Sequence, residues 1–151
     1  MYTYSIYWLT EEVAIRYFHK SGLLYRFLKE YIKQPNRIDL RKQFEYITYR
    51  FCREEIVAYM KQQKRINCID YIDKRNMKLY NREAFITLHI DERQLKFRCE
   101  TLEDAEELLF PLLRRYEPML FIVGENICNF GWITPFLKYR QTEEEVLFSF
   151  R

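Results

Sequence analysis

The sequence predicts an α+β fold, in which helices pack against a mainly antiparallel sheet of about five strands. An aromatic strand pattern at the N-terminus, a long helical stretch after it and a return to strand patterns in the second half lead to this prediction. The expected order is β-α-α-α-β-β-α-β-β. With 48% hydrophobic residues, a chain of 151 residues can bury a sizeable core. We expect a single α+β domain over residues 1–140 and a C-terminal tail, 141–151, to which the sequence assigns no element.

The first predicted elements are a strand and a short helix that follows it directly. Tyr2, Tyr4 and Ile6 occupy alternate positions, which is the period of a half-buried strand. Thr10 suits the N-cap of the helix, because its hydroxyl can accept a hydrogen bond from a free amide of the first turn. The two glutamates after it place negative charge at the positive end of the helix dipole.

Helical periodicity then continues to about Gln63. A second helix is expected to end before Pro35, and a third to begin near Asp39. A further helical stretch begins at about Arg53, and the pattern fits one bent helix as well as two separate ones. Residues 67–80 have no clear period and are expected to form an irregular connection, with room for a short strand.

Strand patterns return in the second half of the chain. Residues 85–99 alternate as two strands of a hairpin around a polar turn. Thr101 then resembles the start of a capping box, in a helix that Pro111 is expected to kink. The run 119–123 is apolar at every position, as expected of a strand covered on both faces, and a last strand is expected over residues 127–133.

The sequence contains no motif that indicates catalysis, a cofactor or a metal site. It has no glycine-rich phosphate loop, no nucleophile elbow and only two histidines. Four widely spaced cysteines are expected to be reduced, partly buried thiols. His89 stands close to Asp91 and Glu92 like a base with its carboxylate, but a hairpin histidine of this kind is more often structural. We therefore expect no enzyme activity.

The N-terminus has no basic region of the kind that begins a signal peptide. No apolar run approaches the 18 or so residues that are needed to cross a bilayer. A cytoplasmic protein without a membrane contact is expected.

Basic and aromatic residues of the helical half suggest nucleic-acid binding as an alternative function. Residues 1–75 hold 15 basic and 9 acidic residues, with tyrosines among the basic ones, and this combination can bind phosphates and stack on bases. The acidic residues weaken the positive field, and no DNA- or RNA-reading motif is present. A solvated helical face is therefore favoured, and no direct sequence-specific binding to nucleic acid is expected.

The first helix has more apolar surface than one sheet can cover. Val13 and Tyr17 form one row at i and i+4, beside Arg16 and Lys20. Tyrosine and arginine are frequent anchors of protein interfaces, so this edge is a candidate binding surface. The alternative is that the two apolar side chains complete the core, and the residues alone leave both interpretations open.

Four motifs occur in an order and spacing that resemble a known family. They are an N-terminal strand of alternating aromatics, Tyr7-x-x-x-Glu11-Glu12-x-Ala14-x-x-Tyr17-Phe18, Tyr46-Ile47-Thr48 and Gly131-Trp132-x-x-Pro135. With them the chain resembles the SirA family, the sporulation inhibitors of replication of spore-forming Firmicutes. The resemblance implies a protein that binds the N-terminal domain of the replication initiator DnaA and blocks new rounds of replication.

The same resemblance assigns roles to individual positions. Those matching Val13 and Tyr17 carry the initiator contact in the family, and Pro135 matches a position tied to inhibition. This chain has valine where an aromatic residue can stand, so a smaller contact is expected at Val13. Trp132 is expected to pack in the core. The predicted partner-binding residues are Val13, Arg16, Tyr17, Lys20 and Pro135.

Overall fold

The computed structural model describes residues 1–64, 66–70 and 75–134. In this part of the chain, the elements are β1 (Tyr2–Trp8), α1 (Glu11–Tyr17), α2 (Ser21–Lys33), α3 (Ile38–Ile47), α4 (Arg53–Lys61), β2 (Asn67–Asp70), β3 (Asn76–Tyr80), β4 (Phe85–Ile90), β5 (Leu95–Cys99), α5 (Leu102–Leu108), α6 (Phe110–Tyr116), β6 (Leu120–Gly124) and β7 (Phe130–Trp132). The predicted tail, 141–151, lies outside the described residues, so the predicted domain boundary stays a prediction. No helix of the described part is long and apolar enough to cross a membrane.

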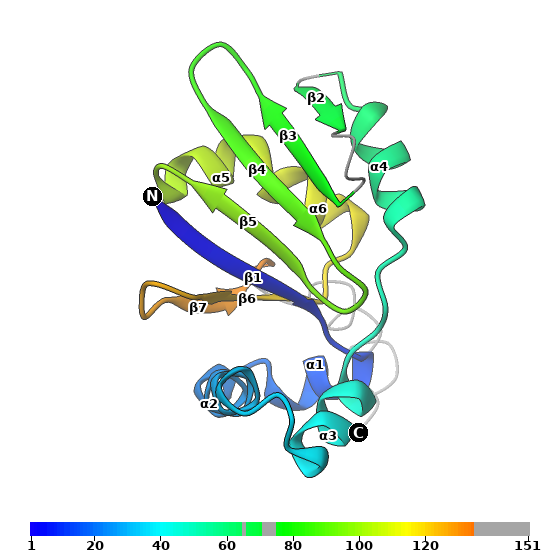
Figure 1. Cartoon of the computed structure of the whole chain (residues 1–151), viewed down its shortest axis with the longest axis vertical. Coiled ribbons are helices and arrows are strands. Elements are labelled where there is room, and N and C mark those ends of the chain that lie inside the picture. The colour runs from blue at the N-terminus through cyan, green and yellow to red at the C-terminus, as the bar shows by residue number, and fades with distance from the viewer. Residues whose placement is uncertain (65, 71–74, 135–151) are drawn as a thin grey trace, which may run out of the picture.

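The described strands form one sheet in the order β2-β3-β4-β5-β1-β6-β7, and each neighbouring pair is antiparallel (Figure 1). The α+β class predicted from the sequence is therefore confirmed. The first strand of the chain lies well inside the sheet, because Tyr4 of β1 pairs with Phe97 of β5 on one side and with Gly124 of β6 on the other. The helices α1 to α4 are inserted between β1 and the remaining strands, as expected.

Side chains of β1 alternate between two hydrophobic cores, because successive residues of a strand point to opposite faces. Tyr4 and Ile6 belong to the larger core, together with residues of α4, α5 and α6. Tyr7 and Leu9 belong to a second core with residues of α2 and α3. In Figure 1, α5 and α6 lie behind β4 and β5, whereas α1, α2 and α3 form a separate group beside β1 and β6. This second helical group holds the candidate site.

The sheet has more strands than the five predicted, because the irregular connection expected over residues 67–80 contains β2 and β3. In β3 only Met77 and Leu79 face the core, and two apolar positions among polar residues give a weak periodic signal. The observed order is β-α-α-α-α-β-β-β-β-α-α-β-β. The helical stretch after Asp39 is two helices, since Thr48 is extended and forms an isolated bridge with Leu9.

Helix ends also differ in part from the predictions. Thr101 caps α5 as expected, since its Oγ1 accepts a hydrogen bond from the Asp104 amide at 3.2 Å. Thr10 occupies the N-cap of α1, but its side chain makes no cap hydrogen bond. The predicted kink is a break at Leu109, after which Pro111 lies in the first turn of α6, where its missing amide proton costs little. The last strand is shorter than expected and spans Phe130–Trp132.

Candidate protein-binding groove

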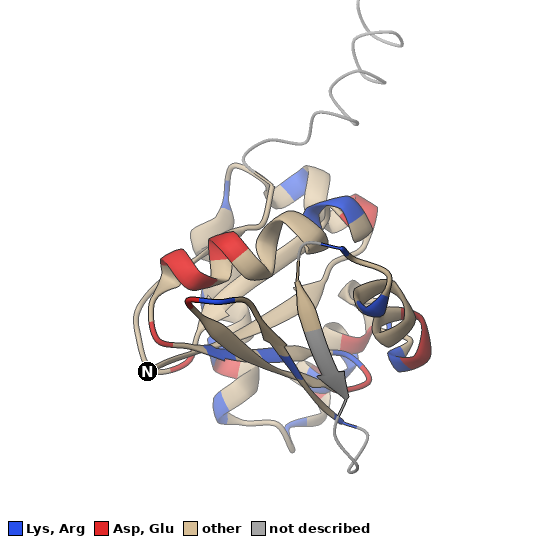
Figure 2. Cartoon of the chain, turned by 90° about the horizontal axis from the view of Figure 1, so that it is seen from above, with Lys and Arg blue, Asp and Glu red and all other residues tan. Residues whose placement is uncertain are grey.

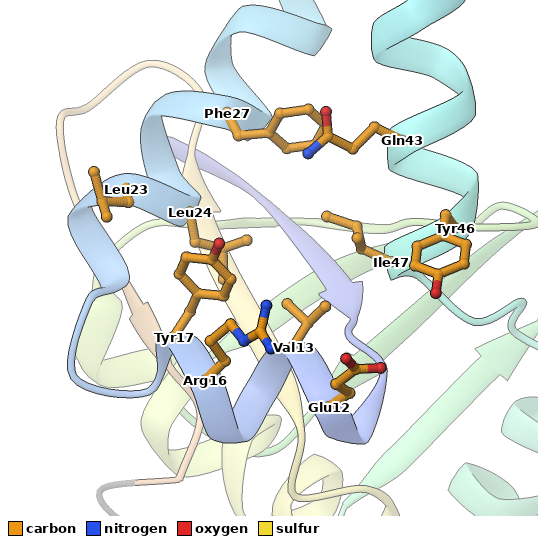
Figure 3. A pocket seen from close by; sticks show the side chains of 10 residues that line it. All are labelled: Glu12, Val13, Arg16, Tyr17, Leu23, Leu24, Phe27, Gln43, Tyr46 and Ile47. Carbon is orange, nitrogen blue, oxygen red and sulfur yellow. The ribbon is translucent and has the colours of Figure 1, made fainter.

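The helices α1, α2 and α3 enclose an open groove with a volume of about 310 Å³ (Figure 3). The side chains around it come from all three helices, and most of them are apolar or aromatic. The lining residues are Glu12, Val13, Arg16, Tyr17, Leu23, Leu24, Phe27, Gln43, Tyr46 and Ile47.

The helix α1 contributes its Val13 and Tyr17 row to this groove. Ala14 is completely buried against Met119 on another side of the helix. Because successive residues of a helix are rotated by about 100°, this packing turns Val13 and Tyr17 towards α2 and α3. Both are only partly buried, and Arg16 beside them is exposed. Val13 packs against the second core, as the core alternative expects for it, whereas Tyr17 is partly buried in the lining of the groove.

The helices α2 and α3 provide the floor and the far wall. Leu24 and Ile47 are buried and close the floor, whereas Leu23 and Tyr46 stand on the rim with 49% and 78% of their surface exposed. Exposed apolar side chains around a hollow are typical of binding surfaces, because these side chains stay in contact with water until a partner covers them.

The groove is held together by backbone contacts between its walls. The Thr10 amide, at the start of α1, donates to the Ile47 carbonyl at the end of α3 at 2.9 Å. One residue further on each side, Leu9 and Thr48 form the bridge that fixes β1 next to α3. The position of α3 relative to α1 therefore does not depend on the side chains of the rim.

Two charged residues, Glu12 and Arg16, belong to the lining, and both are exposed on α1. Within the described residues neither has a salt-bridge partner. An apolar hollow with one positive and one negative charge at its edge suits an apolar side chain of another protein, with polar contacts around it.

The structure brings together three of the five predicted partner-binding residues. Val13, Arg16 and Tyr17 line the groove. Lys20 is exposed and precedes the first turn of α2, outside the lining. Pro135 lies outside the described residues. Trp132, expected in the core, is half-buried and packs against Phe18 and Phe121.

Sequence reasoning did not assign the residues that α2 and α3 add to the groove. Tyr46 carried a usable signal, because Phe44 and Ile47 form the buried side of α3 and a helical wheel places Tyr46 away from Phe44. Leu23 is less distinctive, since its neighbour Leu24 is buried and the pair reads as ordinary core. That both face Tyr17 follows only from the packing of the three helices.

The basic residues of the helical half do not form a surface of one sign. Figure 2 shows basic and acidic segments next to one another on the helices. Arg37 forms salt bridges with Glu30 and Asp39, and its hydrogen bonds lower the pKa of the Asp39 carboxyl. A second hollow, of about 380 Å³, is lined by several charged residues, but Arg50 there is paired with Glu92 at 3.0 Å.

His89 lies in β4, half-buried between two polar neighbours. Its Nδ1 is 2.8 Å from Oδ1 of Asn76, and its Nε2 is 3.6 Å from Oδ2 of Asp91. The first contact joins β4 to β3, which fits a structural histidine. Within the described residues, no group of three or more His, Cys, Asp or Glu side chains is arranged to hold a metal ion.

Comparisons with known proteins agree with the family resemblance of the sequence. The family model described as sporulation inhibitor of replication protein SirA matches residues 2–137. A relative from Bacillus subtilis (strain 168), the sporulation inhibitor of replication protein SirA, is 22% identical over 143 residues, which cover 87% of this chain and 93% of the relative. The family match includes every residue of the groove.

Proposed function

The chain belongs to the SirA family of sporulation inhibitors of replication, and we propose that it restrains the initiation of chromosome replication during sporulation by binding the N-terminal domain of the initiator DnaA. In this proposal it acts in the cytoplasm as a binding protein, without catalysis or a cofactor. It makes no direct sequence-specific contact with nucleic acid and no contact with a membrane.

The observation that supports the proposal is the groove itself. Positions that the family resemblance associates with the initiator, Val13 and Tyr17, face an open apolar hollow, and Tyr46 stands across from them with 78% of its surface exposed. Aromatic side chains around a hollow that loses its water on binding commonly form the centre of a protein interface. The initiator domain would place apolar surface in this groove.

A groove of this size is only the middle of such an interface. A stable complex commonly buries about 800 Å² on each partner, so residues around the groove must also make contact. Arg16 on the rim and Lys20 just outside it are exposed cations at one end of α1. They would steer a partner with acidic surface and affect the rate of association more than the strength of the complex. Occupying the initiator domain would exclude other assembly partners from the same face.

The direct test is titration calorimetry of the full chain against the isolated N-terminal domain of DnaA at near-physiological salt. We expect saturable binding with one molecule of each protein in the complex. Failure of the parent chain to bind would overturn the proposal.

An electrophoretic mobility shift with DNA tests the alternative, since nanomolar, sequence-selective retardation by the chain alone would favour a nucleic-acid-binding function.

A further inference from the structure

The helix α1 is too short to hold its own position. It spans seven residues, Glu11–Tyr17, and a single helix of that length is not stable in water without tertiary contacts. The side chains at its two ends therefore depend on whatever holds each end in place. Because Tyr17 is the last residue of α1, its place in the groove depends on the C-terminal attachment.

The N-terminal end of α1 is fixed by the backbone. The Leu9 amide donates to the Met119 carbonyl at 3.1 Å, and the Thr10 amide donates to Ile47 at 2.9 Å. In the middle of the helix, Ala14 is buried against Met119. These contacts position Val13 and leave the last turn to be held by other groups. One of them is the Lys20 amide, which donates to the Tyr17 carbonyl at 3.0 Å.

A tryptophan from the opposite end of the chain holds that last turn. Nε1 of Trp132 donates a hydrogen bond to the carbonyl of Phe18, the C-cap residue of α1, at 3.2 Å. The two rings are stacked, with centroids 5.5 Å apart and an angle of 25° between their planes. Trp132 thus satisfies a carbonyl of the helix end and packs beside it.

Trp132 is itself firmly placed on the sheet. It pairs with Phe121 in the β6–β7 ladder, and their rings meet edge to face at 5.0 Å. The next two residues continue the attachment, since the Ile133 amide donates to Leu120 and the Thr134 hydroxyl donates to Pro118, both at 2.9 Å. Moving the end of α1 would therefore disturb the packing of Trp132 on β6.

We propose that Trp132 is a positioning residue for the groove: through Phe18 it fixes the end of α1 that carries Arg16 and Tyr17, and it does so without lining the groove itself. The inference rests on the proposed function, because binding of the initiator domain is one of its readouts. The tryptophan of the late Gly-Trp motif would then act at a distance from the binding surface.

Substitution of Trp132 tests the inference, with an aromatic control residue on another strand of the sheet. Trp132→Ala removes both the ring and the donor, and we expect about a tenfold loss of affinity for the DnaA domain. Trp132→Phe keeps a ring without the N–H group and should lose less. Phe85→Ala is the control, because Phe85 of β4 is an aromatic residue of the same sheet, is 38% exposed and does not line the groove. It should leave the affinity within about twofold of the parent.

Hydrogen exchange separates positioning from general destabilisation. In Trp132→Ala, amides in the last turn of α1 should exchange faster, while those of β1 and β5 keep their protection. Faster exchange throughout the sheet, or unchanged exchange in α1, would contradict the inference.

A double substitution distinguishes action through α1 from a separate contact with the partner. If Trp132 acts by placing Tyr17, Trp132→Ala should cost less affinity in the Tyr17→Ala background than in the parent. Fully additive losses would show an independent contact and overturn the inference, as would parent-like binding of Trp132→Ala. If the parent chain does not bind DnaA at all, the proposed function fails, and exchange in α1 still decides whether Trp132 positions the helix.

Discussion

Tyr17 of α1 and Tyr46 of α3 stand on opposite walls of one groove, with Leu24 and Ile47 between them at its floor (Figure 3). The walls are joined by the backbone, since the Thr10 amide bonds to the Ile47 carbonyl. Substituting a side chain on the rim should therefore change the binding of a partner without unfolding the protein.

Tyr46→Ala should weaken binding without loss of stability. Its ring is 78% exposed, so its removal should change the free energy of unfolding by less than about 0.5 kcal/mol. If the ring anchors the interface, binding of the DnaA domain should lose about 2 kcal/mol, roughly thirtyfold in affinity. Calorimetric titration and a melting curve measure the two effects.

The matched control for Tyr46 is Ile38→Ala. Ile38 lies on the same helix and is 64% exposed, but it does not line the groove. It should keep both the stability and the affinity of the parent. Equal losses of affinity in the two variants would mean that the groove is not the part of α3 that the partner contacts.

Tyr17→Ala should reduce affinity far more than Lys20→Ala. Tyr17 lines the groove and is partly buried, so its truncation should cost about 2 kcal/mol or more of binding. Lys20 is exposed outside the lining, and its removal should mainly slow association and weaken its salt dependence. Association and dissociation rates over a salt series distinguish the two.

A melting curve is needed to interpret Tyr17→Ala. As a half-buried rim residue, Tyr17 should be replaceable with most of the thermal stability kept. A core aromatic would cost about 3–5 kcal/mol, and binding would then be lost through unfolding. A folded variant that binds like the parent would move the site away from α1.

The fold class could be predicted because the two periodic signals are strong where burial is complete. The fully apolar run that becomes β6 reflects a strand with both faces buried. The alternation of β1 predicted a strand correctly but a half-buried one, whereas residues 4–7 are all buried because β1 lies inside the sheet between two cores. The signal failed over β3, where polar neighbours surround the two inward residues Met77 and Leu79. The strand β3 forms through its pairing with β4, which the local sequence pattern does not indicate.

The site could be predicted only along α1. The i,i+4 spacing placed Val13 and Tyr17 on one edge, which is a local property of a helix. Tyr46 and Leu23 join them because α2 and α3 pack around a short α1, and no local pattern encodes that packing. The attachment of Trp132 to Phe18 is equally remote in sequence and became visible only in the structure.

Thiol labelling should distinguish Cys99 from two other cysteines. Cys52 and Cys128 are exposed, whereas Cys99 is completely buried, and burial raises the pKa of its thiol to about 11. Since the thiolate is the reactive form, iodoacetamide at mildly alkaline pH should modify Cys52 and Cys128 in the folded protein and Cys99 only after unfolding. Peptide mass mapping reads out each site, and labelling of Cys99 as fast as Cys128 would contradict its burial.

Glu117→Gln should stabilise the protein at neutral pH and have little effect in acid. The Glu117 carboxylate accepts a hydrogen bond from the Met119 amide at 3.2 Å, yet desolvation raises the pKa of this group above its usual value of 4.5. A carboxyl with a raised pKa in the folded state favours folding when protonated, so the parent loses stability as the pH rises through the folded pKa.

Glutamine stays neutral and can still accept the bond from Met119. The melting temperature of Glu117→Gln should therefore exceed that of the parent near neutral pH, and the two curves should converge well below the usual glutamate pKa of 4.5. Glu45→Gln, at an exposed position of α3, is the control and should not change the pH dependence in this way. A difference of the same size at every pH would show that charge at Glu117 is not its cause.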